Sequence, residues 1–174
     1  MKSFMSGRLF LSAAVLIAAF VFLAGCQQQP PDASQRLKPL FDKWVEIWNT
    51  GNLDELDAII GPNFVRHVNL SPDVVGLDAL KKAISGLRAA YPDLKLVVDD
   101  EIYAENKCAA RWILTGTNTG PGEMPPTGKP VKIWGLGVLH FAGGKIAEEW
   151  VGYDNLALMQ QLGVAVSPPS GEKK

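Results

Sequence analysis

The sequence predicts an α+β fold in which a curved antiparallel sheet packs against helices from the N-terminal part of the chain. Apolar residues recur three and four positions apart before Pro92, and their spacing changes to two after it. A Gly-Gly pair at 143–144 separates the last two alternating segments, which is typical of a β-hairpin. Helices first and antiparallel strands afterwards favour the α+β class.

Each element follows from these patterns and from the residues that interrupt them. Polar turn residues at 49–52, Gly61-Pro62 and Pro92 mark the ends of the expected helices. The expected helices cover residues 37–48, 53–60 and 77–91, and a short strand is expected at 64–69. A last short helix can begin after Asp154 or Asn155 as its cap and end at Gly163.

The second half is rich in branched and aromatic residues, which favour strands. The expected strands cover residues 94–104, 108–119, 131–141 and 145–153, with a Pro/Gly-rich loop at 120–130. A curved sheet of this kind, wrapped against helices, would form a cone with an apolar interior. Such an interior suits a small ligand.

The first 25 residues have the pattern of an export signal. Lys2 and Arg8 precede an apolar run at 9–22, which is too short for a stable membrane span. The segment closes with Leu-Ala-Gly-Cys26, which resembles the bacterial lipoprotein signal. That resemblance implies acyl chains on Cys26, and several chains together anchor a protein firmly. An ordinary signal peptide that happens to contain a cysteine is the alternative.

These features predict the organisation and the location of the chain. The expected parts are a signal peptide (1–25), a lipidated tether (26–34), one folded domain (35–166) and a disordered tail (167–174). We expect a lipid-anchored protein of the bacterial cell envelope. In a host with two membranes, Gln27 after the cysteine favours the periplasmic leaflet of the outer membrane.

Composition argues against several functional classes. The net charge is −1 without a basic block, so no nucleic acid is expected as a partner. With two histidines, and with Cys108 as the one thiol left after lipidation, no metal site is expected. Cys108 lies in an apolar, strand-like segment, which predicts a buried and inert thiol.

Several short segments of the folded domain together indicate a family. They are Trp-Asn-Thr-Gly-Asn-Leu-Asp (48–54), Ala-Ala-Tyr-Pro-Asp-Leu (89–94), Arg-Trp (111–112), Gly-Thr-Asn-Thr-Gly (116–120), Pro-Pro-Thr-Gly-Lys (125–129), Gly-Lys-Ile-Ala-Glu-Glu-Trp (144–150), Asp154 and Gln-Gln-Leu-Gly (160–163). With these segments the chain resembles the SnoaL-like polyketide cyclases, or ester cyclases, of the nuclear-transport-factor-two-like superfamily. The resemblance covers roughly residues 35–163 and implies a cone fold that commonly forms homodimers.

The resemblance also implies a reaction. Enzymes of that family close a ring by intramolecular aldol condensation, without a metal or a cofactor. They use an aspartate near the end of the last strand and a histidine on the strand before it, and Asp154 and His140 fall at the corresponding places. Family members often carry histidine where this chain has Asn118, whose amide can instead bond a carbonyl group.

Strand alternation groups the same two residues independently. One face of the 131–141 strand carries Trp134, Leu136, Val138 and His140, and one face of the next carries Glu148, Trp150, Gly152 and Asp154. If this face lines the cone, burial would make the Asp154 carboxylate a stronger base, with His140 assisting. The alternatives are that Asp154 only caps the last helix and that His140 is a core or rim histidine.

Six further residues are candidates for contacts with the ligand: Trp48, His67, Arg111, Asn118, Trp134 and Trp150. Surface-strand, ion-pair and core roles are the alternatives for them. The expected function is binding of a small, apolar, carbonyl-bearing molecule, with aldol-type cyclisation, enolisation or isomerisation by acid/base chemistry and no cofactor. A non-catalytic ligand-binding lipoprotein, or an envelope-assembly module that dimerises through its sheet, is the alternative.

Overall fold

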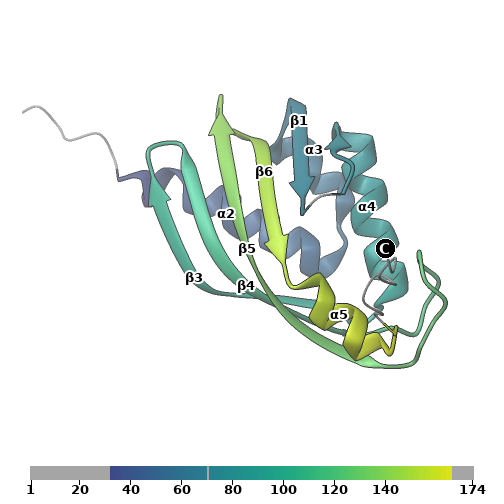
Figure 1. The fold of residues 1–174 in the computed structure, drawn as a ribbon. Helices are drawn as coiled ribbons and strands as arrows, with labels where there is room; N and C mark the ends of the chain where they lie inside the picture. Colours follow the sequence, from purple (N-terminus) through teal and green to yellow (C-terminus); the bar gives the residue numbers. More distant parts are fainter. Residues whose placement is uncertain (1–31, 70, 166–174) are drawn as a thin grey trace, which may run out of the picture. The chain divides into compact units, whose positions relative to one another are not determined.

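The computed structural model describes residues 32–69 and 71–165 (Figure 1). Its helices are α2 (Ala33–Thr50), the 3₁₀ turn η1 (Leu53–Glu55), α3 (Leu56–Ile59), α4 (Leu77–Ala90) and α5 (Asn155–Leu162). Its strands are β1 (Ile60–Val68), β2 (Val74–Val75), β3 (Lys95–Ala104), β4 (Lys107–Thr117), β5 (Pro130–Ala142) and β6 (Lys145–Tyr153). The predicted signal peptide, Cys26 and the predicted tail lie outside the described residues.

The strands form one sheet in the order β2-β1-β6-β5-β4-β3, which confirms the α+β class. Neighbouring strands are antiparallel, except that β1 runs parallel to β6. The long strands β3, β4 and β5 bend along their length (Figure 1), as the expected cone requires. None of the described helices is long and apolar enough to cross a membrane.

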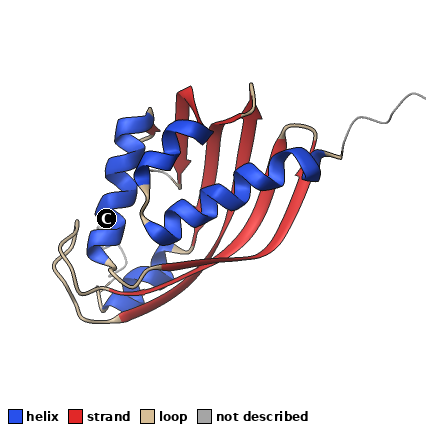
Figure 2. Ribbon diagram, turned by 180° about the vertical axis from the view of Figure 1, so that it is seen from behind, coloured by secondary structure: helices blue, strands red, loops and turns tan. Residues whose placement is uncertain are grey.

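Helices cover one face of the sheet, which we call the inner face (Figure 2). The first amphipathic helix, α2, buries its apolar side against this face, and Leu139 and Phe141 of β5 lie in the same core. Burial alternates along β5, with Val131, Ile133 and Leu139 inside and Lys132 outside. The opposite, outer face has no described helix packed on it and is the face seen in Figure 1.

The helix ends follow the local signals in the sequence. The Asp32 side chain accepts a hydrogen bond at the start of α2, and Gly51 ends that helix with a left-handed φ of 75°. The expected helix at 53–60 is wrong at its end, because η1 and the short α3 stop at Ile59. Ile60 pairs in parallel with Ile146 of β6, so strand pairing replaces helix propensity at this point.

Candidate functional site

The structure places most of the predicted site residues on the outer face. In β5, Gly135, Gly137 and Leu139 are buried, whereas Trp134 is 56% exposed. Trp150 of β6 is 51% exposed. The expectation that His140, Trp134 and Trp150 line the cone is therefore wrong. Alternation shows which residues share a face, but it does not decide which face packs on the helices.

Asp154 does not lie in the cone either. It is exposed and caps α5, where its Oδ1 accepts a hydrogen bond of 2.9 Å from the backbone N–H of Ala157. His140 contacts Glu148 instead, with 2.6 Å between Nδ1 and Oε2. The structure thus does not form the expected pair of Asp154 and His140, and it places Asp154 in the capping position that was the alternative.

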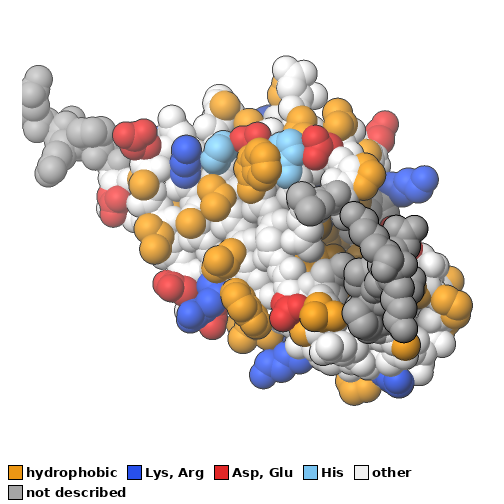
Figure 3. All heavy atoms as spheres, in the orientation of Figure 1, with side chains coloured by type: hydrophobic (Ala, Val, Ile, Leu, Met, Phe, Trp, Pro, Cys, Tyr) orange, Lys and Arg blue, Asp and Glu red, His pale blue; other side chains and the backbone are white. Residues whose placement is uncertain are grey.

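Both histidines of the chain meet at Glu148 on the outer face. Glu148 Oε1 lies 3.3 Å from His67 Nε2, and His67 Nδ1 lies 2.7 Å from Asp73 Oδ1. The His67 ring stacks on Trp150 at 3.9 Å between centroids. Figure 3 shows the two histidines on either side of a hydrophobic side chain, with acidic groups beside them. We call His67, Asp73, His140 and Glu148 the histidine cluster.

The histidine cluster stabilises the ionised form of Glu148. Burial alone would raise the pKa of Glu148, but hydrogen bonds from Trp150 and the histidines, and the charge of His140, outweigh it, so the pKa lies below the ordinary 4.5. A carboxyl group with a lowered pKa in the folded state stabilises the fold above its ordinary pKa. This contribution is lost as the pH falls through the lowered value.

We therefore expect the Glu148→Gln variant to unfold at lower urea concentration than the wild type at pH 7. The difference should shrink as the pH falls below about 4.5. Urea denaturation over a pH series measures it. The other charged groups near the histidines are the same in both proteins. They are Asp73, which contacts His67, and Lys107, which lies opposite His140 in the register of β4 and β5. A difference that is the same at pH 3 and pH 7 would contradict this role of Glu148.

The other predicted ligand residues divide between the two faces. Arg111 lies on the outer face and pairs with Asp99 at 2.9 Å, which raises the pKa of Arg111. Asn118 is buried and accepts a hydrogen bond of 2.8 Å from the Thr127 backbone, so it fixes the loop after β4. Trp48 is buried on the inner face, where it was expected to contact a ligand.

A second polar group, which the sequence reasoning missed, lies on the inner face. Arg66 of β1 and Glu149 of β6 are in register, and Arg66 Nε donates to Glu149 Oε2 at 2.5 Å. The two side chains are 16% and 6% exposed. The Arg66 guanidinium also lies 4.8 Å above the Trp48 ring. A buried ion pair among aromatic rings is thus built where two neighbouring strands run parallel.

Trp112 and Tyr153 extend this group along the inner face. Their rings are 6.4 Å apart, and the Trp112 ring occupies the space that the absent side chain of Gly135 leaves open. Burial raises the pKa of nearby Tyr91, with a further contribution from Tyr153, so the Tyr91 hydroxyl stays protonated. The inner-face cluster is defined as Trp48, Arg66, Trp112, Glu149 and Tyr153.

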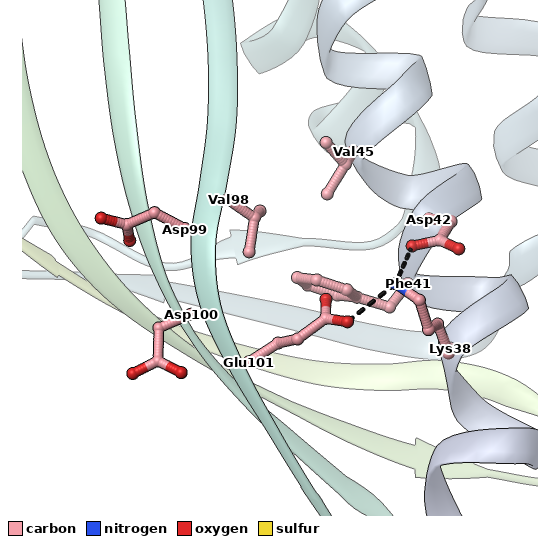
Figure 4. Close-up of a pocket in the computed structure, with 8 residues that line it drawn as sticks. All are labelled: Lys38, Phe41, Asp42, Val45, Val98, Asp99, Asp100 and Glu101. Atoms are coloured by element: carbon pink, nitrogen blue, oxygen red, sulfur yellow. Dashed lines mark hydrogen bonds and ion pairs between the residues drawn. The ribbon is translucent and has the colours of Figure 1, made fainter.

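Two grooves of the described residues lie away from the inner-face cluster. One, of about 580 Å³, runs between α2 and β3, and Lys38 bridges Asp42 and Glu101 within it (Figure 4). The other, of about 490 Å³, lies by Arg111 and Trp134. Within the described ranges, no group of three or more histidine, cysteine or acidic residues is arranged to hold a metal ion.

Solved structures share this fold. A proposed SnoaL-like polyketide cyclase from Jannaschia is 22% identical with a TM-score of 0.71, over 80% of this chain and 99% of that chain. AclR, a proposed hydroxylase from Streptomyces galilaeus, is 27% identical with a TM-score of 0.67, over 80% and 91% of the chains. A proposed polyketide cyclase from Bacillus cereus is 28% identical with a TM-score of 0.61, over 73% and 80%.

The family itself follows from the sequence profile. Among curated proteins, none matches this chain significantly. The profile described as SnoaL-like polyketide cyclase matches residues 39–162, which span most of α2, the later helices and all six strands of the sheet. The chain therefore belongs to the SnoaL-like polyketide cyclase family.

Proposed function

We propose that this domain binds a small, largely apolar organic molecule with a carbonyl group against the inner-face cluster. The Arg66–Glu149 pair carries the proposal, because a buried charge pair among tryptophans costs desolvation energy that a core of apolar residues would avoid. Membership of a family described by its polyketide cyclases supports a small organic partner.

The same residues suit proton transfer. Arg66 holds Glu149 Oε2, and Glu149 Oε1 can accept a proton from the carbon next to a carbonyl group. The electron pair of the broken C–H bond forms a C=C bond, and the carbonyl pair moves to oxygen. The enolate can then take the proton back at another carbon, or attack a second carbonyl whose alkoxide takes that proton from Glu149. The catalytic roles of Asp154 and His140 stay predictions, and their positions do not support them.

Native mass spectrometry of the mature chain with Cys26→Ala, purified without denaturation, tests the ligand. We expect a co-purifying small organic molecule that is retained by the Glu148→Gln control and reduced by Trp48→Ala. A wild-type chain that carries no such molecule and takes up none from a panel of aromatic ketones would contradict the proposal. A ligand bound without turnover would instead favour the non-catalytic binding protein.

We further propose that the protein is lipid-anchored in a bacterial cell envelope through Cys26. The Leu-Ala-Gly-Cys segment after an apolar run supports this. The Cys26→Ala protein should leave the membrane fraction and appear in the soluble envelope fraction, and its retention in the membrane would contradict the anchor.

We also propose that two copies of the chain form a homodimer through the outer face. Trp134, Leu136 and Trp150 are each more than half exposed on that face, with 56%, 54% and 51% of their surface accessible. Adjacent exposed apolar residues of this size commonly mark an interface. Analytical ultracentrifugation of the wild type beside Trp134→Lys measures it, and a wild type that stays monomeric would contradict the dimer.

A further inference from the structure

One position above Gly137 is flanked by a hydrogen-bond donor, Trp112 Nε1, and by two acceptors, the Trp150 carbonyl oxygen at 3.8 Å and Glu149 Oε1. A Cβ atom at Gly137 would lie 3.6 Å from Trp112 Nε1 and 3.9 Å from Glu149 Oε1. Glycine leaves this position empty on a strand whose other inner residues fill their space with side chains. A ligand oxygen at this position would have to lie about 0.7 Å closer to Trp112 Nε1 to reach the ordinary hydrogen-bond distance of about 2.9 Å.

Trp112 is held in place for such a contact. A Cβ atom at Gly135 would lie 2.2 Å from the Trp112 ring, so the ring rests directly on the backbone of β5. Indole Nε1 can only donate a hydrogen bond. Among the described residues, the Tyr103 hydroxyl is the one fully buried side-chain polar atom without a hydrogen-bond partner. Trp112 is half-buried, and its Nε1 is therefore not fully sealed from solvent.

We infer that Trp112 is a catalytic residue that donates its indole N–H to the substrate oxygen while Glu149 takes the proton from the adjacent carbon. This inference rests on the proposed function. As the C–H bond breaks, its electron pair forms the C=C bond and negative charge collects on the oxygen beside Trp112. The indole keeps its own proton and stabilises that charge by a hydrogen bond from a fixed position.

The arrangement also selects the substrate class. The carbonyl group must pass directly over the backbone of β5 at Gly137, and it must carry hydrogen on the neighbouring carbon. A flat ketone fits this requirement, whereas a ligand with a bulky substituent beside the carbonyl group does not. Gly137, which lies beside the inner-face cluster, is therefore the specificity-determining position, since any side chain there occupies the place of the substrate oxygen.

The probe for this inference is 2-naphthol, whose hydroxyl oxygen can accept from Trp112 and whose O–H can donate to Glu149. The full mature chain with Cys26→Ala, labelled with ¹⁵N, is titrated and followed by the indole N–H resonances. We expect the Trp112 resonance to move downfield on binding. Trp112→Phe should weaken binding roughly tenfold, because it removes the N–H donor while keeping a smaller aromatic ring at the position.

Two controls make the result specific. Trp150→Phe removes an indole N–H on the outer face and should leave 2-naphthol binding unchanged. Gly137→Ala adds one methyl group at ordinary contact distances, so the protein should fold and lose the downfield shift. If 2-naphthol binds equally to wild type and Trp112→Phe with an unmoved Trp112 resonance, the inference is wrong and the proposed function stands. If 2-naphthol does not bind the wild type at all, the inference is wrong, and uptake from the panel of aromatic ketones then decides the proposed function.

Discussion

Replacing Glu149 by alanine is expected to lower the free energy of unfolding by about 3 kcal/mol, because it leaves the Arg66 charge without its partner. The Arg66 side chain is only 16% exposed, so water can solvate its charge only poorly once the carboxylate is removed. Among the described residues, the guanidinium then keeps its contact with the Trp48 ring. Urea denaturation monitored by circular dichroism measures the loss, and 2-naphthol binding in the same variant reports whether the site survives.

The matched control is Glu148→Ala, one residue earlier in the chain. Its side chain is 33% exposed on the outer face, so at neutral pH the expected loss is below about 1 kcal/mol. A double variant, Arg66→Met with Glu149→Leu, should lose less than Glu149→Ala, since it removes both charges together. Equal losses for Glu148→Ala and Glu149→Ala would show that the inner and outer carboxylates do not differ as described.

The Gly135→Ala variant is expected to lose about 2 kcal/mol of unfolding free energy through overpacking. The new Cβ atom would lie 2.2 Å and 2.5 Å from two atoms of the Trp112 ring and 2.7 Å from the Gly152 carbonyl oxygen. The ring can turn away, but the backbone oxygen on β6 cannot move without disturbing the sheet. Thermal and urea denaturation measure the loss, and near-ultraviolet circular dichroism reports the displaced ring.

Gly137→Ala provides the comparison on the same strand and face. Its nearest neighbours would lie at 3.6 to 3.9 Å, which is ordinary contact, so its stability should stay close to the wild type. Combining Gly135→Ala with Trp112→Phe should recover part of the loss, because the smaller ring removes the colliding atoms. Gly135→Ala at wild-type stability would mean that Trp112 does not rest on β5.

Much of the fold could be predicted from local signals. Apolar spacing located α2 and α4, and the glycine pair at 143–144 located the hairpin between β5 and β6. The start of β1 could not be predicted in this way. Ile60 joins the sheet by pairing with Ile146, far along the chain, and no local pattern contains that contact.

The candidate site was predicted less well, for a reason that lies in strand geometry. Alternation correctly placed His140 and Glu148 on one face, but aromatic residues made that face look like the interior. The buried face of β5 instead carries glycines, whose missing side chains make room for Trp112 from β4. The adjacent glutamates 148 and 149 point to opposite faces, so this pair was the signal for an inward carboxylate.

The histidine cluster has a consequence for kinetics. Both imidazoles of the chain are engaged with Glu148 on the outer face, so neither is expected to reach a ligand at the site proposed on the inner face. Between pH 5 and 8, a pH-dependent change in the rate of an enzyme ordinarily reports the titration of a histidine side chain. The rate of the proposed reaction is therefore expected to show no histidine inflection between pH 5 and 8.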